Sequence, residues 1–211
     1  MKNRRTWLTA CAAVVVACTG QSEAALSTAN HSASGSVEFT VDLWPGEGIP
    51  VIEARRAMLL VRAEPDPDSP VVDTIRVPRG RRLAFDATRV QTITAGTIRS
   101  LAPMHVTGRD MGSTSHVSHE QYYFPTKADV SIPVTAATTI DYLQYRAEGT
   151  CFVRIDRRVI DAYPCPGFGP ESVVVERQPL TRWWIRVQGE SGAAGWILVS
   201  DSTAQSVRRE F

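Results

Sequence analysis

Residues 151–165 read CFVRIDRRVIDAYPC, and this stretch decides the fold class. Its first five residues alternate, with Cys151, Val153 and Ile155 on one side and Phe152 and Arg154 on the other, which is the period-two pattern of a strand. A polar Asp-Arg-Arg segment at 156–158 follows, and 159–163 are again apolar and β-branched. The stretch therefore predicts a β-hairpin, and cross-linking its open end would fix the register that a two-stranded ribbon alone holds poorly.

The cysteine count supports a bond between Cys151 and Cys165. The chain has four cysteines, and the other two, at positions 11 and 18, lie in the N-terminal export segment described below. Exported proteins meet an oxidising compartment, where a pair of cysteines forms a disulfide. A metal site at this pair would need further ligands, and no other Cys and no His occurs from residue 150 to the C-terminus.

The rest of the chain from residue 37 onward repeats the same pattern of short strands. Runs of Val, Ile, Thr and aromatic residues are separated by Pro, Gly and Asp clusters, which predicts an all-β fold of the small barrel or sandwich type. Helical signals are weak, although 51–60 could hold a turn or two and 118–122 could begin another. The expected strands are 37–41, 57–62, 71–77, 82–85, 89–94, 97–101, 138–145, 151–155, 159–163, 172–176, 183–187 and 194–199.

The N-terminus resembles a bacterial lipoprotein signal. Basic residues at 2, 4 and 5 precede an apolar run that is too short to span a bilayer as a mature helix. Val15-Val16-Ala17-Cys18 is similar to a lipobox, which implies cleavage after residue 17 and a lipid on Cys18. The alternative is ordinary secretion with cleavage after Ala24. Residues 18–36, rich in Ser, Ala, Thr and Gly, are interpreted as a flexible tether that holds the domain away from a membrane.

The charge of the predicted mature chain is nearly balanced. Without residues 1–17 it has 20 basic and 22 acidic side chains, a net charge of −2. A nucleic-acid-binding protein would be expected to carry an excess of clustered basic residues, so this composition argues against that class.

Two distant motifs together resemble bacterial Src homology 3-like domains. The sequence WIRV at 184–187, a polar turn, and Gly195-Trp196-Ile197 are similar to the C-terminal half of that family, while VRAEP at 61–65, PVVDTI at 70–75 and PRG at 78–80 are similar to the N-terminal half. The resemblance implies small barrels in which Gly195 permits a close approach and Trp196 fills the interior.

The halves are separated by about a hundred residues, which leaves two arrangements open. The first is a tandem pair of barrels, at 37–125 and 126–205 with a tail at 206–211. The alternative is one barrel with a large insertion.

Catalytic signals are weak. His116 and His119, with His105 and Asp110 nearby, could supply zinc ligands, but the Gly/Ser/Thr-rich segment 108–119 is better interpreted as an exposed polar loop. A cysteine peptidase would need a free Cys beside a His, but Cys151 and Cys165 are expected to be bonded to each other. A Gly-x-Ser-x-Gly elbow and a phosphate-binding glycine loop are missing from the sequence. We therefore expect no enzyme activity and no cofactor.

The aromatic residues suggest either cores or a ligand groove. Adjacent strand residues point to opposite faces, so one of Trp183 and Trp184 is expected inside and the other outside. Grooves lined by aromatic residues on barrels of this kind bind extended peptides. The expected function is a non-catalytic binding or scaffold module of the cell envelope, anchored to a membrane, with peptidoglycan peptide or an envelope protein as ligand. The alternative is a metal-dependent hydrolase or enzyme accessory that uses His105, His116 and His119. The candidate groove residues are Tyr142, Tyr145, Trp183, Trp184 and Trp196.

A thiol titration tests the disulfide. A denatured, unreduced sample of the chain lacking Cys11 and Cys18 should contain essentially no free thiol. Replacing both Cys151 and Cys165 with serine should lower the free energy of unfolding by about 2–4 kcal/mol, because the cross-link restricts the unfolded chain. Two free thiols per chain would contradict the pairing.

Overall fold

The computed structural model describes residues 36–44, 46, 50–123, 129–167 and 172–207. It confirms the all-β class, because the described residues form sixteen strands and one five-residue helix, α1 (His119–Tyr123). The strands are β1 (Phe39–Val41), β2 (Val51–Ala54), β3 (Met58–Arg62), β4 (Val71–Arg76), β5 (Ala87–Thr94), β6 (Gly96–Ser100), β7 (Met104–Gly112), β8 (His116–Val117), β9 (Asp129–Val134), β10 (Thr139–Tyr145), β11 (Cys151–Ile155), β12 (Arg158–Ala162), β13 (Val173–Arg177), β14 (Leu180–Gln188), β15 (Ala194–Val199) and β16 (Ala204–Val207).

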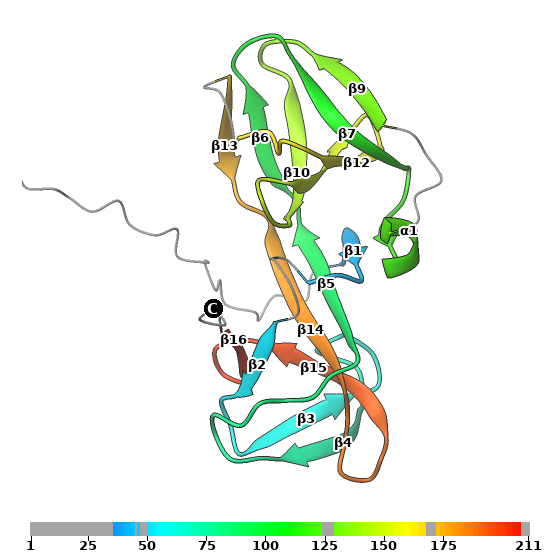
Figure 1. The fold of residues 1–211 in the computed structure, drawn as a ribbon, viewed down its shortest axis with the longest axis vertical. Coiled ribbons are helices and arrows are strands. Elements are labelled where there is room, and N and C mark those ends of the chain that lie inside the picture. Colours follow the sequence, from blue (N-terminus) through cyan, green and yellow to red (C-terminus); the bar gives the residue numbers. More distant parts are fainter. Residues whose placement is uncertain (1–35, 45, 47–49, 124–128, 168–171, 208–211) are drawn as a thin grey trace, which may run out of the picture.

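The strands form two seven-stranded sheets and one two-stranded ribbon. The first sheet has the order β4-β3-β15-β14-β5-β1-β8, the second has the order β13-β6-β10-β11-β12-β7-β9, and β16 pairs with β2. Figure 1 shows the second sheet above the first, with β5 and β14 running between the two ends of the molecule. Nearly all the pairs are antiparallel, and the exception is the short pair of β1 with β8.

Two nearly continuous strands pass from one sheet into the other. β5 is followed after one residue by β6, and β13 is followed after two residues by β14. These two long segments pair with each other twice, as β5 with β14 in the first sheet and as β6 with β13 in the second (Figure 1). The sheets are therefore joined by one antiparallel ribbon that changes sheet at Ala95 and at Gln178–Pro179.

The sheet change depends on a close backbone approach at Gly96. A Cβ atom there would lie 2.4 Å from the carbonyl oxygen of Arg177 and 2.7 Å from the nitrogen of Pro179. Pro179 has no N–H to donate to a ladder, so the pairing is interrupted at this point. The side chain of Arg177 crosses the junction and donates from Nη2 to the carbonyl oxygen of Ala95 at 2.9 Å.

The predicted hairpin is present in the second sheet. β11 and β12 pair from Cys151 opposite Ala162 to Ile155 opposite Arg158. Asp156 and Arg157 form the two-residue turn with φ angles of 48° and 67°, which is the backbone geometry expected for such a hairpin. The structure confirms the disulfide between Cys151 and Cys165, whose Cα atoms lie 5.2 Å apart.

Hydrophobic residues cover both faces of the second sheet. One face contains a core around Ile98, Ile140, Val153 and Ile160. The opposite face packs Phe152, Leu143 and Val159 against Phe39 and Val41 of β1, and the rings of Phe39 and Phe152 are 5.5 Å apart. The first sheet has a separate core, in which the largest fully buried aliphatic residues are Ile52, Leu59, Ile185 and Ile197.

The strand pairing differs from a division at residue 125. β3 and β5 precede that position, yet they pair with β15 and β14, which follow it. β6 and β7 likewise belong to a sheet with β10–β13. Residues 96–177 thus form an insertion within the first sheet, because they contain all seven strands of the second sheet and also the short edge strand β8 of the first sheet. The physical reason is that strands far apart in sequence pair as well as neighbours do, and an alternation pattern does not identify the partner.

Four local expectations also differ from the structure. Residues 51–54 form a strand, not a helical turn, because Val51 and Ile52 pair with β16. Residues 104–112 form β7, although 108–119 read as a loop; Gly108 is needed there because a Cβ would lie 2.2 Å from the carbonyl oxygen of Asp161. The strand β9 was missed because of its Pro133. Residues 82–85 contribute only the single bridge of Arg82 with Glu53.

Replacing Gly96 with alanine should destabilise the whole chain. The added methyl group meets backbone atoms that cannot move without breaking the ribbon, so we expect a loss of about 1–3 kcal/mol in the free energy of unfolding. The matched control is Thr94→Ala, an exposed position on the same strand segment, which should change stability by less than about 0.5 kcal/mol. Equal denaturant midpoints for the two variants would contradict the role of Gly96.

Candidate ligand-binding surfaces

The two halves of the sequence motif lie beside each other in the first sheet. β3 and β4 carry the N-terminal half, β14 and β15 carry the C-terminal half, and the sheet order places β3 next to β15. Trp196 pairs with Arg62, and a Cβ at Gly195 would lie 2.4 Å from the carbonyl oxygen of Arg62. The glycine therefore permits the close approach that the sequence suggested.

The five aromatic residues expected in a groove are spread over several environments. Tyr142 is 2% exposed in the core of the second sheet, and burial raises the pKa of its hydroxyl group. Trp184 is fully buried, whereas Tyr145 is 37% exposed at the end of β10. Trp183 packs edge-on against Trp44 with ring centres 4.9 Å apart. These residues do not line one groove.

Trp196 is buried, with 9% of its surface exposed, but it lies on the face of the first sheet opposite the core of Ile185 and Ile197. It shares the outer face of the first sheet with Arg62, its pair partner, while Ile197 points into the core. The guanidinium group of Arg89 lies 5.0 Å from the centre of the Trp196 ring. Arg89 is held in turn by Asp42, from Nε to Oδ1 at 2.6 Å. The ring is therefore a nearly buried part of the outer face, with a cation over it.

The loop 63–70 covers Trp184 on this outer face. The indole Nε1 donates to Oε1 of Gln91 at 2.9 Å, and Nε2 of Gln91 donates to the carbonyl oxygen of Pro65 at 2.8 Å. Arg62 closes the loop by donating to the carbonyl oxygen of Ser69 at 2.6 Å. The buried tryptophan thus has its hydrogen bond satisfied, which identifies it as a packing residue that anchors the loop.

An apolar strip lies on the exposed face of β3 and β4, and the sequence analysis missed it. Met58 and Leu60 alternate with the core residues Leu59 and Val61, so they face away from the core. Their exposed fractions are 52% and 45%, and Val72 on β4 is 43% exposed. The signal was present in the strand: a run of four apolar residues that alternates between core and solvent must expose two of them.

Part of the outer edge of β4 is already occupied by the β14–β15 turn. The N–H of Glu190 donates to the carbonyl oxygen of Thr74 at 3.0 Å, and the N–H of Arg76 donates to the Glu190 carboxylate at 2.6 Å. Ser191 donates from its hydroxyl to Asp73 at 2.7 Å. This hydroxyl is the largest cause that lowers the pKa of Asp73. The turn covers the edge of β4 at residues 73–76. A ligand would therefore contact the apolar strip on the exposed face of β3 and β4 and would not pair with this part of the edge.

The three histidines do not converge. His105 lies on β7 with Nδ1 3.0 Å from the hydroxyl of Ser131. His116 contacts Asp42 at 2.9 Å. His119 begins α1 and packs on the ring of Tyr123. Within the part of the chain that the structure describes, no group of three or more His, Cys, Asp or Glu side chains could hold a metal ion.

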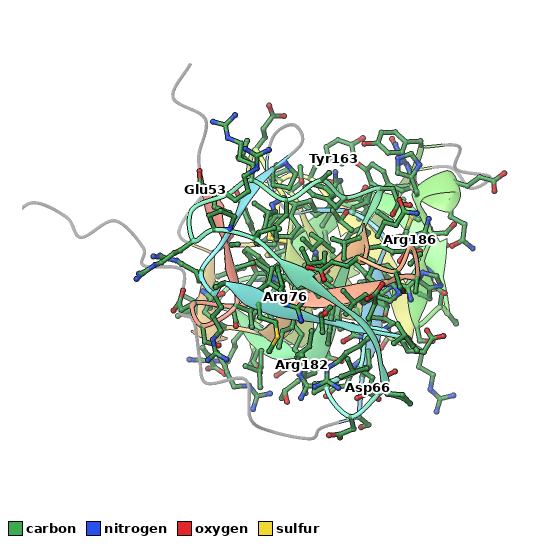
Figure 2. The ribbon with its side chains drawn as sticks, turned by 90° about the horizontal axis from the view of Figure 1, so that it is seen from below. Glu53, Asp66, Arg76, Tyr163, Arg182 and Arg186 are labelled. Carbon is green, nitrogen blue, oxygen red and sulfur yellow. A yellow bond between two sulfur atoms is a disulfide. The ribbon has the colours of Figure 1, made fainter. Side chains whose placement is uncertain are left out.

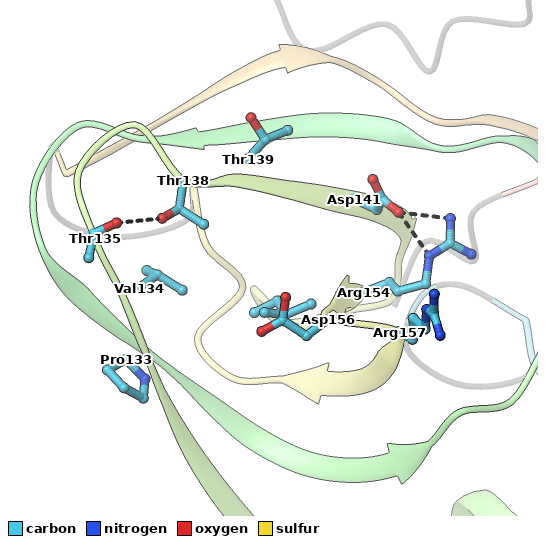
Figure 3. A pocket seen from close by; sticks show the side chains of 10 residues that line it. Pro133, Val134, Thr135, Thr138, Thr139, Asp141, Arg154, Asp156 and Arg157 are labelled. Atoms are coloured by element: carbon cyan, nitrogen blue, oxygen red, sulfur yellow. Dashed lines mark hydrogen bonds and ion pairs between the residues drawn. The ribbon is translucent and has the colours of Figure 1, made fainter.

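A polar hollow of about 520 Å³ lies on the second sheet between the β9–β10 and β11–β12 turns. Figure 3 shows Arg154 paired with Asp141, which neutralises both charges, while Asp156 and Arg157 come from the hairpin turn. Arg154 also contacts Glu38 at 3.4 Å. The remaining residues that line the hollow are Pro133, Val134, Thr135, Thr138, Thr139 and Ile155.

A buried ion pair fastens α1 to the second sheet. Nη1 of Arg146 lies 3.1 Å from Oδ1 of Asp161, and their side chains are 20% and 7% exposed. The guanidinium group also stacks 4.0 Å from the centre of the Tyr122 ring. Burial raises the pKa of Asp161, and the charge of Arg146 opposes that shift. The ion pair of Arg146 and Asp161 thus packs between Tyr122 of α1 and the second sheet.

Comparison with known proteins identifies no relative. No protein-family model, no curated protein and no solved structure matches this chain.

The pH dependence of stability tests the environment of Asp161. Its folded-state pKa lies above 3.8, so the protonated folded form contributes stability at low pH that is lost as the pH rises through that pKa. Asp161→Asn should remove this loss of stability with rising pH from the curve of unfolding free energy against pH, measured by urea denaturation. Asp141→Asn leaves Asp161 in place, so the same loss of stability should remain in its curve. An unchanged curve for Asp161→Asn would contradict the assignment.

Proposed function

We propose that this protein is a non-catalytic binding or scaffold module of the bacterial cell envelope. In this proposal acyl chains on Cys18 hold it at a membrane, and residues 18–36 separate the domain from the bilayer. The signal segment and Cys18 lie outside the described residues, so the export part of the proposal rests on the sequence. Among the described residues no helix is long and apolar enough to cross a membrane.

The observation that carries the proposal is the apolar strip of Met58, Leu60 and Val72. Exposed apolar side chains that gather on neighbouring strands are typical of protein or peptide contact sites. Trp196 lies on the same face of the sheet, one strand away from β3, where Arg89 covers it. The strip thus provides apolar contacts along the strand direction with an arginine and a tryptophan on one side.

The shape of this surface suits an extended peptide. Side chains of an extended segment alternate, so every second one could contact the row formed by Met58 and Leu60. The resemblance to bacterial Src homology 3-like domains supports the same class of ligand, since the motif segments build β3, β4, β14 and β15. The ligand proposed is a peptidoglycan peptide or an extended segment of an envelope protein.

A charge placed in the strip should weaken binding. In the full chain carrying Cys18→Ser, so that no acyl chain contributes, Leu60→Asp should weaken retention on purified sacculi or on immobilised envelope extract by about tenfold or more, because a buried leucine contributes about 1.5–3 kcal/mol.

The matched control is Leu101→Asp. Leu101 is 50% exposed, close to the 45% of Leu60, but it follows β6 in the second sheet. It should leave retention unchanged. No retention of the parent chain on either material, or equal loss in both variants, would contradict the proposed function.

A further inference from the structure

The end of the molecule formed by β2, β3 and β4 carries a concentrated positive charge. Residues 53–57 read EARRA and residues 77–82 read VPRGRR, so the two segments hold five arginines and one glutamate. The predicted mature chain as a whole has more acidic than basic residues. Such a local excess is therefore a feature of this end and not of the composition.

The fold brings the two segments into contact. The N–H of Ala54 donates to the carbonyl oxygen of Arg81 at 2.9 Å, and the N–H of Gly80 donates to the carbonyl oxygen of Ala54 at 2.8 Å. Val77 is bonded in the same way to Ala57 at 3.0 Å. Arginines separated by about 25 positions in the chain thus become neighbours on one surface. These residues form the arginine cluster: Arg56, Arg79, Arg81 and Arg82.

The arginine cluster lacks internal counter-ions. Within the described part of the chain, none of its four side chains is in an ion pair, and all four residues are exposed. Among the residues that the structure describes, seven other arginines are paired with carboxylates: Arg76, Arg89, Arg99, Arg146, Arg154, Arg158 and Arg186. Charges that the fold itself does not neutralise are available to an anionic partner.

Two members of the cluster, Arg81 and Arg82, line an open hollow of about 450 Å³ together with Gly80. Gly80 has a φ angle of 81°, and nothing lies within 4 Å of the position its Cβ would take. The backbone is therefore open to solvent between the arginines. Figure 2 looks onto this end of the molecule, where Glu53 marks the β2 side and Arg76 lies over β4.

From these observations we propose that the arginine cluster binds the phosphate groups of an anionic lipid surface. Guanidinium groups bind phosphate oxygens in pairs, and clusters of arginine next to a membrane add their attractions. This inference rests on the envelope location in the proposed function, which brings the domain to a membrane. It adds an orientation: the β2–β4 end faces the bilayer.

Two features favour a lipid surface over a nucleic acid. Met58 follows Arg56 by two residues and is 52% exposed, so an apolar side chain accompanies the charges, as in proteins that lie at the headgroup boundary. Residues 53–58 and 77–82 contain no aromatic side chain, whereas single-stranded nucleic acids are held by stacking on aromatic rings.

Vesicle sedimentation tests the inference. The full chain carrying Cys18→Ser should bind vesicles that contain phosphatidylglycerol and should not bind vesicles of phosphatidylcholine alone. The double variant Arg81→Gln, Arg82→Gln should weaken binding roughly 25-fold, because each arginine near an anionic surface contributes about fivefold.

The matched control removes two exposed arginines from the other end of the molecule. Arg99→Gln with Arg157→Gln changes the net charge equally but lies on β6 and on the β11–β12 turn, and it should bind as the parent does. Equal weakening in both double variants would overturn the inference, because it would indicate a general charge effect.

Two further arms identify the source of the phosphate. Inorganic phosphate should displace the protein from vesicles no better than chloride does at equal ionic strength. Selective displacement by phosphate, or binding to duplex DNA without binding to vesicles, would overturn the lipid assignment. Retention on sacculi depends on Leu60, so a chain that binds sacculi but not vesicles would remove this inference and leave the proposed function standing.

Discussion

The antiparallel pairing of β5–β6 with β13–β14 is the constraint on which the rest of the structure depends. In the first sheet β14 and β5 are adjacent, with β15, β3 and β4 beyond β14 and with β1 and β8 beyond β5. In the second sheet the remaining strands follow β6 on the side away from β13. A single ribbon therefore sets the direction of both sheets. Its weak point is the place where hydrogen bonding is interrupted, and there Gly96 and Arg177 replace the missing ladder with a close backbone contact and a side-chain bond.

This ribbon explains how the insertion is tolerated. The chain leaves the first sheet along β5, builds all seven strands of the second sheet and the short edge strand β8 of the first, and returns along β14 beside the strand by which it left. The ends of residues 96–177 are thus held together by β6 and β13, which pair directly. The disulfide then closes the hairpin inside the insertion, where Phe152 and Val153 must be buried on opposite faces.

The all-β class and the disulfide hairpin could be predicted because both are local. Alternation in residues 151–155 identifies a strand, and two cysteines at the ends of one hairpin have few other partners. The pairing of β3 with β15 is not local, and no feature of Val61 or Trp196 in isolation specifies the other strand. The resemblance to Src homology 3-like domains implied that Trp196 fills the barrel interior, whereas the ring is buried on the outer face of the sheet, where the guanidinium group of Arg89 lies over it. The apolar strip was missed for a related reason, since an apolar run predicts burial of both faces until the neighbours of the strand are known.

The two proposed surfaces lie at the same end of the molecule, and one is apolar whereas the other is positively charged. The apolar strip follows β3 and β4, whereas the arginine cluster lies where β2 turns into β3 and where the chain leaves β4. Met58 stands at the boundary between them, opposite Arg76 in the strand pairing. If the cluster faces a bilayer, the strip stands beside the membrane, not beneath it, and the second sheet points away from the lipid. A ligand that approaches along the membrane surface could then reach Leu60 and Val72 while the arginines stay in contact with phosphate groups, so Met58 at the boundary is the one residue that the two surfaces share.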